Sequence, residues 1–284
     1  MKPIVLTERA QKYLARLGID PNTERLFCNK DLLIRLQYEH VTRIPYENID
    51  ILRGRPLPLD YDGQFDKMVT HARGGYCFEL NGLFGHLLVD LGYGVTTFMS
   101  RYLRGETQIP MRRHRVIQAV CPDGTFLCDV GVGQQAPRHP LVLQPDLVQE
   151  QFGETYKLIR EPFYGWTVMD LHQGSWRRFY SFTEEEQLDL DFVMPSYYCE
   201  HAPDSIFRAA PMIAIKTRDG RKTIDGNTFR QFSPEGVVEK TLTGQAEMAA
   251  VLEQHFGIRL DEEPDHGPWS WLDHERFFTE ENGG

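Results

Sequence analysis

Paired or clustered cysteines are missing from this chain of 284 residues. Its five cysteines are odd in number, widely spaced and without a CxxC pair: Cys28, Cys77, Cys121, Cys128 and Cys199. This pattern argues against a disulfide framework and against a zinc site. We therefore expect a protein of a reducing compartment that needs no metal.

Long apolar runs and an excess of basic residues are missing too. No stretch approaches the ~20 apolar residues of a membrane span, and Met1–Glu8 lacks the apolar core of a secretory signal. The formal net charge is −10, whereas general nucleic-acid binders are usually basic. The chain also has no glycine-rich phosphate loop of the Walker or dinucleotide type. We expect a cytoplasmic protein that binds neither membranes nor nucleic acid.

The periodicity of apolar residues changes along the chain. Residues 1–92 are mostly helical in pattern, with candidate N-caps at Thr7 and at Asn29 or Asp31. Residues 93–200 hold short apolar segments separated by polar turns, which is typical of a small antiparallel sheet or barrel. Within this part, the acidic run at 183–187 predicts a helix N-terminus.

Residues 201–284 combine strand and helix signals. Asp219-Gly220 predicts a hairpin turn, and Met248–Phe256 predicts an amphipathic helix that ends at Gly257. The acidic tail from Asp261 to Gly284 contains two tryptophans and is expected to pack or to fray in part.

The most informative run of the chain is Arg73–Asn81, with the sequence RGGYCFELN. Cys77 follows a glycine pair and precedes leucines at helical spacing, so we expect it in the first turn of a helix that ends near Gly92. A free thiol titrates near ~8.5, and a helix N-terminus lowers that value. The glycines would allow a tight approach of the backbone, with positive φ where needed. Cys77 alone fits a nucleophile and a buried structural cysteine equally well.

A base for this thiol is suggested by a predicted hairpin. With a two-residue turn at Pro122-Asp123, His114 on the first arm faces Gly131, and Asp129 is a diagonal neighbour about 7 Å away. A turn centred one residue later keeps the two on one face but further apart, and a three-residue turn separates them. The geometry alone therefore leaves open whether His114 and Asp129 cooperate or serve as strand-edge and capping residues.

Together these pieces resemble the arylamine N-acetyltransferase family. The resemblance rests on the Cys77 run, on His114 in a strand and on the sequence Asp129-Val130-Gly131-Val132-Gly133. Ile44–Asn48 and Pro203–Phe207 are similar to two further elements of that family. The similarity covers most of residues 5–260.

The resemblance implies an α+β fold and a catalytic triad. The fold would comprise a helical bundle with the nucleophile (1–92), an antiparallel β-barrel carrying His114 and Asp129 (93–200), and an α/β lid with the C-terminal tail (201–284). Its core would be similar to those of papain and the transglutaminases. Cys77, His114 and Asp129 would transfer an acetyl group from acetyl-coenzyme A, through a thioester on Cys77, to an arylamine, arylhydrazine or N-hydroxyarylamine.

The resemblance also implies a substrate pocket. Tyr46, Val132, Gly133 and Phe207 carry over as its walls. The family often has an aromatic residue where this chain has Val132, so the pocket here is expected to be wider or to differ in preference. A local cationic cluster could meet the phosphates of the coenzyme or be a solvated loop: Arg101, Arg104, Arg112, Arg113 and Arg115.

Three alternatives to the acetyltransferase remain. An amide synthase of the same family would close macrolactams from a carrier-bound acyl chain. A cysteine hydrolase would deliver the acyl group to water. A binding module without catalysis would not need the Cys, His and Asp set. Oligomeric state, physiological acceptor and acyl-donor preference do not follow from the sequence.

Overall fold

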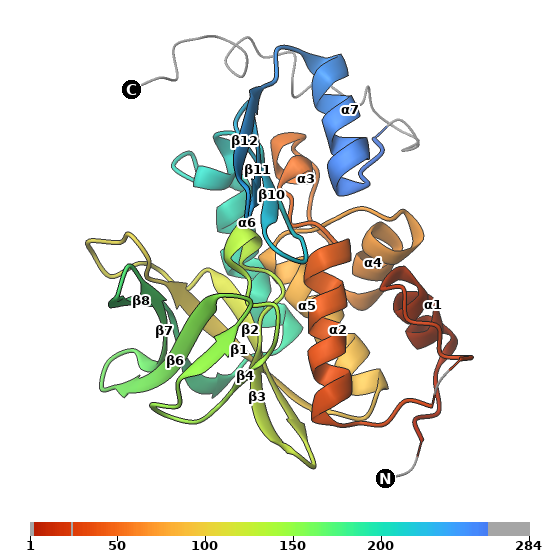
Figure 1. Ribbon diagram of the computed structural model, residues 1–284, viewed down its shortest axis with the longest axis vertical. Coiled ribbons are helices and arrows are strands. Elements are labelled where there is room, and N and C mark those ends of the chain that lie inside the picture. The colour runs from red at the N-terminus through yellow and green to blue at the C-terminus, as the bar shows by residue number, and fades with distance from the viewer. Residues whose placement is uncertain (1–2, 24, 261–284) are drawn as a thin grey trace.

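The computed structural model describes residues 3–23 and 25–260, and it begins with a bundle of helices (Figure 1). The helical elements of this part are, in chain order, α1 (Glu8–Arg16), α2 (Lys30–Arg43), α3 (Ile49–Leu52), α4 (Tyr61–Phe65), the π-helical turn η1 (Asp66–Thr70) and α5 (Cys77–Asp90). Two of the predicted caps are present. Thr7 accepts a hydrogen bond from the amide of Ala10, and Asn29 accepts one from the amide of Leu32.

An antiparallel sheet of eight strands follows the bundle. Its strands are β1 (Gly94–Tyr102), β2 (His114–Cys121), β3 (Gly124–Cys128), β4 (Leu141–Val142), β5 (Gln149–Gln151), β6 (Glu154–Glu161), β7 (Gly165–His172) and β8 (Ser175–Glu186), with the short helix η2 (Gly133–Gln135) after β3. The order in the sheet is β4-β3-β2-β1-β8-β7-β6-β5. A bridge between Pro145, just after β4, and Leu158 of β6 nearly closes the sheet into a barrel. The predicted antiparallel barrel is thereby confirmed.

The helix predicted at residues 183–187 is wrong. These residues belong largely to the end of strand β8, where Glu186 lies opposite Phe98 of β1. Two of the acidic side chains instead form ion pairs on the barrel surface, Glu184 with Arg160 and Glu185 with Arg112. Pairing with a neighbouring strand therefore outweighs the preference of acidic residues for a helix start.

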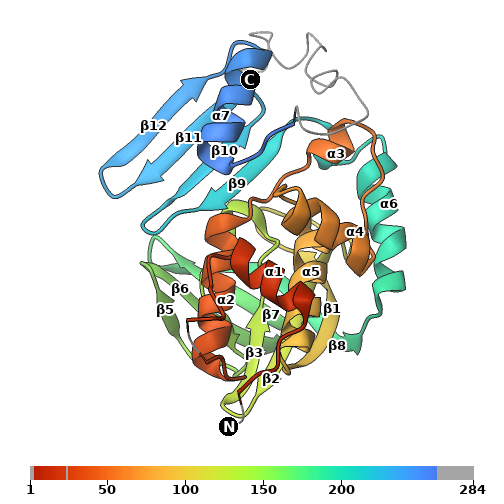
Figure 2. The same cartoon turned by 90° about the vertical axis from the view of Figure 1, so that its right-hand side faces the viewer.

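A second sheet and its helix complete the described chain. The connection contains η3 (Asp189–Phe192), α6 (Val193–His201) and η4 (Ile206–Arg208), and the sheet contains β9 (Met212–Lys216), β10 (Arg221–Asp225), β11 (Thr228–Ser233) and β12 (Gly236–Thr241). Figure 2 shows α7 (Gln245–Phe256) lying across this sheet. Apolar residues of β9 and β10, such as Ile213 and Ile224, share a core with Val251 and Leu252 of α7. Gly257 ends α7 with φ of 69°, as predicted.

Helix α5 and the segment after Pro45 join these parts. Leu83 and Leu87 of α5 share one buried core with Ile117 of the barrel and with apolar residues of α1 and α2. Tyr46 exchanges backbone hydrogen bonds of 2.8 and 2.9 Å with Ala214 of β9, while the amide of Glu47 donates to the carbonyl of Gly75. The loop before α5 is therefore tied to the second sheet. The division after residues 92 and 200 stays a prediction.

Membrane-spanning helices and clustered metal ligands are both absent from the described residues. No helix in this part is long and apolar enough to cross a membrane. No group of three or more His, Cys, Asp and Glu side chains is arranged to hold a metal ion within residues 3–23 and 25–260. The predicted acidic tail lies outside the described residues.

Candidate active site

Cys77 is the first residue of α5, as the sequence predicts. Tyr76 precedes it with an extended backbone, and the amide of Tyr76 donates a 2.8 Å hydrogen bond to the Glu79 carboxylate. This bond occupies one of the amides at the helix start, and it fixes the direction in which the chain enters α5. The thiol therefore sits at a well-defined helix N-terminus.

The glycine pair before Cys77 serves a close backbone contact. A Cβ on Gly74 would lie only 2.2 Å from the carbonyl oxygen of Pro45, so no larger residue fits. Neither Gly74 nor Gly75 has a positive φ, which corrects the suggestion of a left-handed turn. The pair allows the strand-like segment at Tyr46 to run directly beside the nucleophile loop, where Tyr46 and Gly75 form a parallel bridge.

His114 and Asp129 are brought together by the hairpin β2–β3. Ile117 lies opposite Cys128 and Cys121 opposite Gly124, which is the register expected from a two-residue turn at Pro122-Asp123. Strand β3 ends at Cys128, so Asp129 leaves the ladder. Its Oδ2 lies 2.7 Å from Nε2 of the His114 ring, and both side chains are buried.

Asn81 holds the other oxygen of this carboxylate. Asp129 Oδ1 accepts 2.9 Å hydrogen bonds from Asn81 Nδ2 and from the amide of Gly131, and the amide of Val130 donates to Asn81 Oδ1. Asn81 lies one helical turn after Cys77. Asn81 was not predicted to have a role, although the four-residue spacing places its side chain and that of Cys77 on one face of a helix.

Gly131 is required by the closeness of α5. A Cβ at this position would lie 2.9 Å from the Cα atom of Cys77 and 2.7 Å from Asn81 Nδ2. The glycine therefore lets the segment after Asp129 pack directly against the first turn of the helix. Cys77, Asn81, His114 and Asp129 form what we call the Cys77 cluster.

Within the Cys77 cluster, the thiol of Cys77 makes the weakest hydrogen bond. It is 4% exposed, and its Sγ lies 3.9 Å from the carbonyl oxygen of Arg113, to which it donates. Burial raises the pKa of the thiol well above its usual value, and Cys199 and Asp129 add to the rise. The lowering expected from the helix N-terminus is outweighed, so ionisation of the thiol depends on a nearby base.

A cavity of about 340 Å³ opens beside Cys77 and His114. The four predicted pocket residues, Tyr46, Val132, Gly133 and Phe207, all line it. Its volume lies near the lower end of the range typical of small-molecule sites, and most of its lining is apolar or uncharged. The nucleophile candidate and its candidate base therefore face a space suited to a small organic substrate.

Known proteins match this chain over most of its length. A family model described as N-acetyltransferase matches residues 31–264. An arylamine N-acetyltransferase of Escherichia coli is 33% identical over 237 residues, which are 82% of this chain and 84% of that protein. The chain belongs to the arylamine N-acetyltransferase family. It is an acyltransferase.

Solved structures of the family have the same fold. That of the Salmonella typhimurium enzyme has a TM-score of 0.86 and 30% identity, covering 93% of this chain and 95% of that one. That of the Mycobacterium marinum enzyme in complex with CoA has a TM-score of 0.84 and 28% identity, covering 94% and 97%.

The arginines that the sequence gathers around His114 are dispersed in this member of the family. Four of them are engaged away from the cavity: Arg101 with the carbonyl of Pro110, Arg104 with Asp170, Arg112 with Glu185, and Arg115 with Asp189. Arg113 is the member of the set that lines the cavity in the described structure. The predicted cationic cluster is therefore not a single surface.

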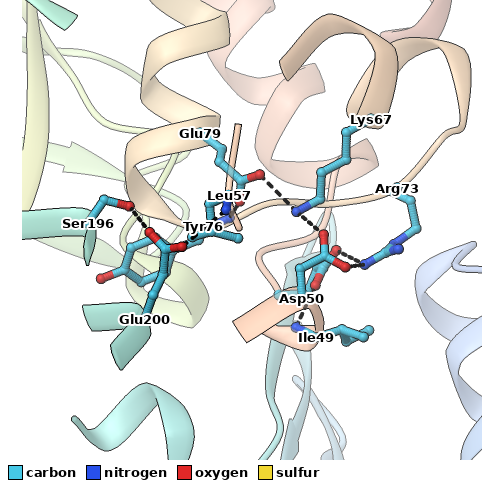
Figure 3. A network of polar contacts seen from close by, with 10 residues as sticks. Ile49, Asp50, Leu57, Lys67, Arg73, Tyr76, Glu79, Ser196 and Glu200 are labelled. Atoms are coloured by element: carbon cyan, nitrogen blue, oxygen red, sulfur yellow. Dashed lines mark hydrogen bonds and ion pairs between the residues drawn. The ribbon is translucent and has the colours of Figure 1, made fainter. Parts of the chain in front are cut away.

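A buried ionic network that was not predicted from the sequence lies close to the Cys77 cluster, through Glu79 of the same helix. Figure 3 shows Lys67 between Asp50 and Glu79. Its Nζ lies 2.6 Å from Asp50 and 2.8 Å from Glu79. Arg73 lies 2.7 Å from Glu47 and 3.3 Å from Asp50. All five side chains are at most 10% exposed. We call Glu47, Asp50, Lys67, Arg73 and Glu79 the Lys67 network.

The Lys67 network contains three carboxylates but two cations. Burial raises the pKa of Glu79 to about 7, and the charge of Lys67 opposes that rise only in part. Burial also acts against the charge on Lys67, but Asp50 and Glu79 raise the pKa of its ammonium group. Burial, together with the negative charge of Asp50, therefore makes Glu79 the carboxylate of this network that takes up a proton near neutral pH.

Proposed function

We propose that this enzyme transfers an acetyl group from acetyl-CoA to an arylamine, arylhydrazine or N-hydroxyarylamine through an acetyl-thioester on Cys77. The observation that carries the proposal is the shared cavity of Cys77 and His114, with His114 held by Asp129 at 2.7 Å. A thiol beside an imidazole that is oriented by a carboxylate is the arrangement that nucleophilic acyl transfer needs.

The imidazole of His114 acts as the base. Its Nε2 donates to Asp129, which fixes the tautomer and leaves Nδ1 to accept a proton from the Cys77 thiol. The negative charge of Asp129 stabilises the imidazolium that results. Since burial keeps the free thiol protonated, the thiolate forms together with the imidazolium rather than alone.

In the first half of the reaction the thiolate attacks the carbonyl carbon of acetyl-CoA. The bond to the sulfur of the coenzyme breaks, a bond to Cys77 Sγ forms, and the proton on His114 leaves with the coenzyme thiol. The free amides in the first turn of α5 would stabilise the oxyanion that develops. The complex of the Mycobacterium marinum relative with CoA supports this choice of acyl donor.

In the second half the amine attacks the thioester on Cys77. A carbon–nitrogen bond forms, the carbon–sulfur bond breaks, and the proton released by the amine passes through His114 back to the thiolate. Tyr46, Val132, Gly133 and Phe207 would hold the aromatic ring beside the thioester. Val132 leaves more room than an aromatic residue would, so we expect bulkier arylamines to be accepted.

The proposed reaction also suggests where the enzyme is located and which part of the chain supplies each catalytic group. A reactive thiol and a coenzyme A thioester suit the cytoplasm, and all five cysteines are free thiols. Residues 1–92 would supply the nucleophile, 93–200 the base and its carboxylate, and 201–284 the lid over the cavity.

Intact-protein mass spectrometry tests the proposal. The protein is mixed with acetyl-CoA, with and without an arylhydrazine, and peptide mapping locates any adduct. One acetyl group on Cys77 that passes to the hydrazine is expected. Cys121→Ser is the matched control, because this half-exposed thiol lies outside the cavity, and it should acquire the same adduct.

Two other outcomes would contradict the proposal. An adduct lost equally fast with and without the hydrazine would indicate a hydrolase. No adduct from acetyl-CoA, but one from a carrier-bound acyl chain, would indicate an amide synthase.

A further inference from the structure

Arg113 is fixed at the nucleophile end of the cavity by its backbone. Its amide donates a 3.1 Å hydrogen bond to the carbonyl of Ser100, and its own carbonyl accepts from the Cys77 thiol at 3.9 Å. His114 follows it directly in the chain. The side chain of Arg113 therefore starts from a position beside both reacting groups.

Arg113 lines the cavity, and its guanidinium lies near Phe207, another lining residue. Its central carbon lies 5.7 Å from the centre of the Phe207 ring, and its side chain is 18% exposed. Burial raises the pKa of Tyr46 in the same cavity, while the charge of Arg113 opposes that rise. The positive charge thus acts on the space where the substrate would lie.

This guanidinium is weakly partnered within the described residues. The carboxylate nearest to it is Glu106, at 3.8 Å, and that side chain is 36% exposed. The distance is too long for a good hydrogen bond, so the forked donors of the guanidinium remain available. The other arginines near His114 are engaged elsewhere. The remaining lining of the cavity is mostly apolar or uncharged, and its one carboxylate among the described residues, Asp225, forms no ion pair with Arg113 within 4.0 Å.

We propose that Arg113 forms a carboxylate-binding subsite next to Cys77, and that it selects substrates carrying a carboxylate. A guanidinium binds a carboxylate through two parallel hydrogen bonds, which gives both affinity and orientation. A low-dielectric cavity strengthens this charge pairing. The inference rests on the proposed acyl transfer and names the chemistry of its preferred substrate.

The position of Arg113 argues against a contact with the coenzyme phosphates. The long pantetheine arm keeps those phosphates far from the sulfur that must approach Cys77. The backbone of Arg113 lies in contact with the Cys77 thiol itself. Its side chain therefore meets the acyl group or the acceptor, and the carboxylate belongs either to the ring of an aromatic amine or to the acyl chain.

Ratios of kcat/KM within each variant test the subsite, because a general effect on catalysis cancels in a ratio. The acceptor pair is 4-aminobenzoate and its uncharged partner 4-aminobenzamide, with p-nitrophenyl acetate as a donor that lacks phosphates. The donor pair is malonyl-CoA and acetyl-CoA, with 4-aminobenzamide as acceptor. Wild type, Arg113→Gln, Arg113→Lys and the control Arg112→Gln are compared.

In Arg113→Gln, kcat/KM for the charged member of one pair should fall by roughly 10- to 100-fold relative to kcat/KM for its neutral partner. Arg113→Lys should recover part of the loss, because it keeps the charge without the fork. Arg112→Gln should leave both ratios as in wild type, because Arg112 pairs with Glu185 outside the cavity. The pair that responds identifies whether the carboxylate comes from the acceptor or from the acyl chain.

Unchanged ratios in both pairs would overturn the subsite. An equal rise of KM for both CoA thioesters, with p-nitrophenyl acetate unaffected, would also overturn it and would make Arg113 a phosphate contact. Wild-type transfer to 4-aminobenzamide reports on the proposed acyl transfer independently, so failure of that function is distinguishable from failure of the subsite.

Discussion

Two polar assemblies lie on opposite sides of the first turns of α5, and they are built differently. Cys77 and Asn81, one turn apart, belong to the Cys77 cluster. Glu79, halfway between them in sequence, instead pairs with Lys67 in the Lys67 network (Figure 3). One short helical segment therefore supplies both assemblies, because residues two apart face opposite sides of a helix.

The two assemblies differ in how completely their polar groups are partnered. In the Lys67 network, short ion pairs join buried charges of both signs. In the Cys77 cluster, Asp129 accepts hydrogen bonds from three donors, whereas the thiol at its open end has one weak contact of 3.9 Å. The start of α5 therefore carries both a tightly paired ionic network and a thiol that is held by one weak contact. Of the two, the thiol lies at the cavity.

Cys77→Ser is expected to have the largest effect and tests the reactive side of the comparison. Serine is isosteric but is far harder to deprotonate, so turnover should fall by several orders of magnitude. The fold should remain, because the side chain makes one weak hydrogen bond. Acetyl transfer and circular dichroism measure the two effects. A serine variant with substantial activity would remove Cys77 as the nucleophile.

Asp129→Asn should reduce turnover by roughly 10²- to 10⁴-fold. An amide at this position no longer holds the His114 tautomer or stabilises its cation, even though the ring remains in the cavity. Steady-state kinetics on the purified variant give the size of the loss. Near-normal rates would show that Asp129 only shapes the loop around Gly131.

Lys67→Met tests the Lys67 network, and we expect this substitution to destabilise the folded protein. Removing one partner of a buried pair leaves carboxylates without their cation, so the free energy of unfolding should fall by about 3–5 kcal/mol. Urea denaturation measures it. Lys12→Met is the control, because Lys12 pairs with Glu8 on the surface and should contribute less than about 1 kcal/mol. Equal losses in the two variants would mean that the Lys67 network is not a structural frame.

Glu79→Gln should have the smallest effect, visible in the pH dependence of stability. The pKa of Glu79 is about 7 in the folded protein, above its ordinary value of 4.5. The folded state then binds more protons than the unfolded state between these values, so this group lowers stability as pH rises from about 4.5 to about 7. Urea denaturation across this range should show wild type losing stability relative to Glu79→Gln. A constant difference would contradict the raised pKa.

Local patterns in the sequence predicted the helix that starts at Cys77 and the register of the hairpin β2–β3, but they left open whether His114 and Asp129 cooperate. The leucine spacing after Cys77 and the turn at Pro122-Asp123 each depend on neighbouring residues, so the helix start and the hairpin register follow from short stretches. The role of Asn81 was readable from its spacing to Cys77 but becomes definite only when the carboxylate of Asp129 is placed beside it.

Long-range charge pairing was not predictable in the same way. Glu47 and Glu79 look like surface charges in the sequence, because burial of a charge depends on partners that the fold brings from elsewhere. The same reason applies to the arginines around His114. They look alike in sequence, but in the structure four of them have close partners, whereas Arg113 has only a long contact with Glu106. The helix predicted for the acidic run at 183–187 was wrong because pairing with β1 determined the structure of this segment.

The backbone pairing of Tyr46 with Ala214 has a consequence for protein synthesis. The segment beside the nucleophile loop gains its second hydrogen-bonded neighbour only from β9, which is made late in the chain. A nascent chain that has released α5 but not β9 therefore lacks one wall of the cavity, and Cys77 is not yet enclosed. The ribosome delivers the nucleophile early and its enclosure late, so an incomplete chain carries an unshielded thiol until translation passes Ala214.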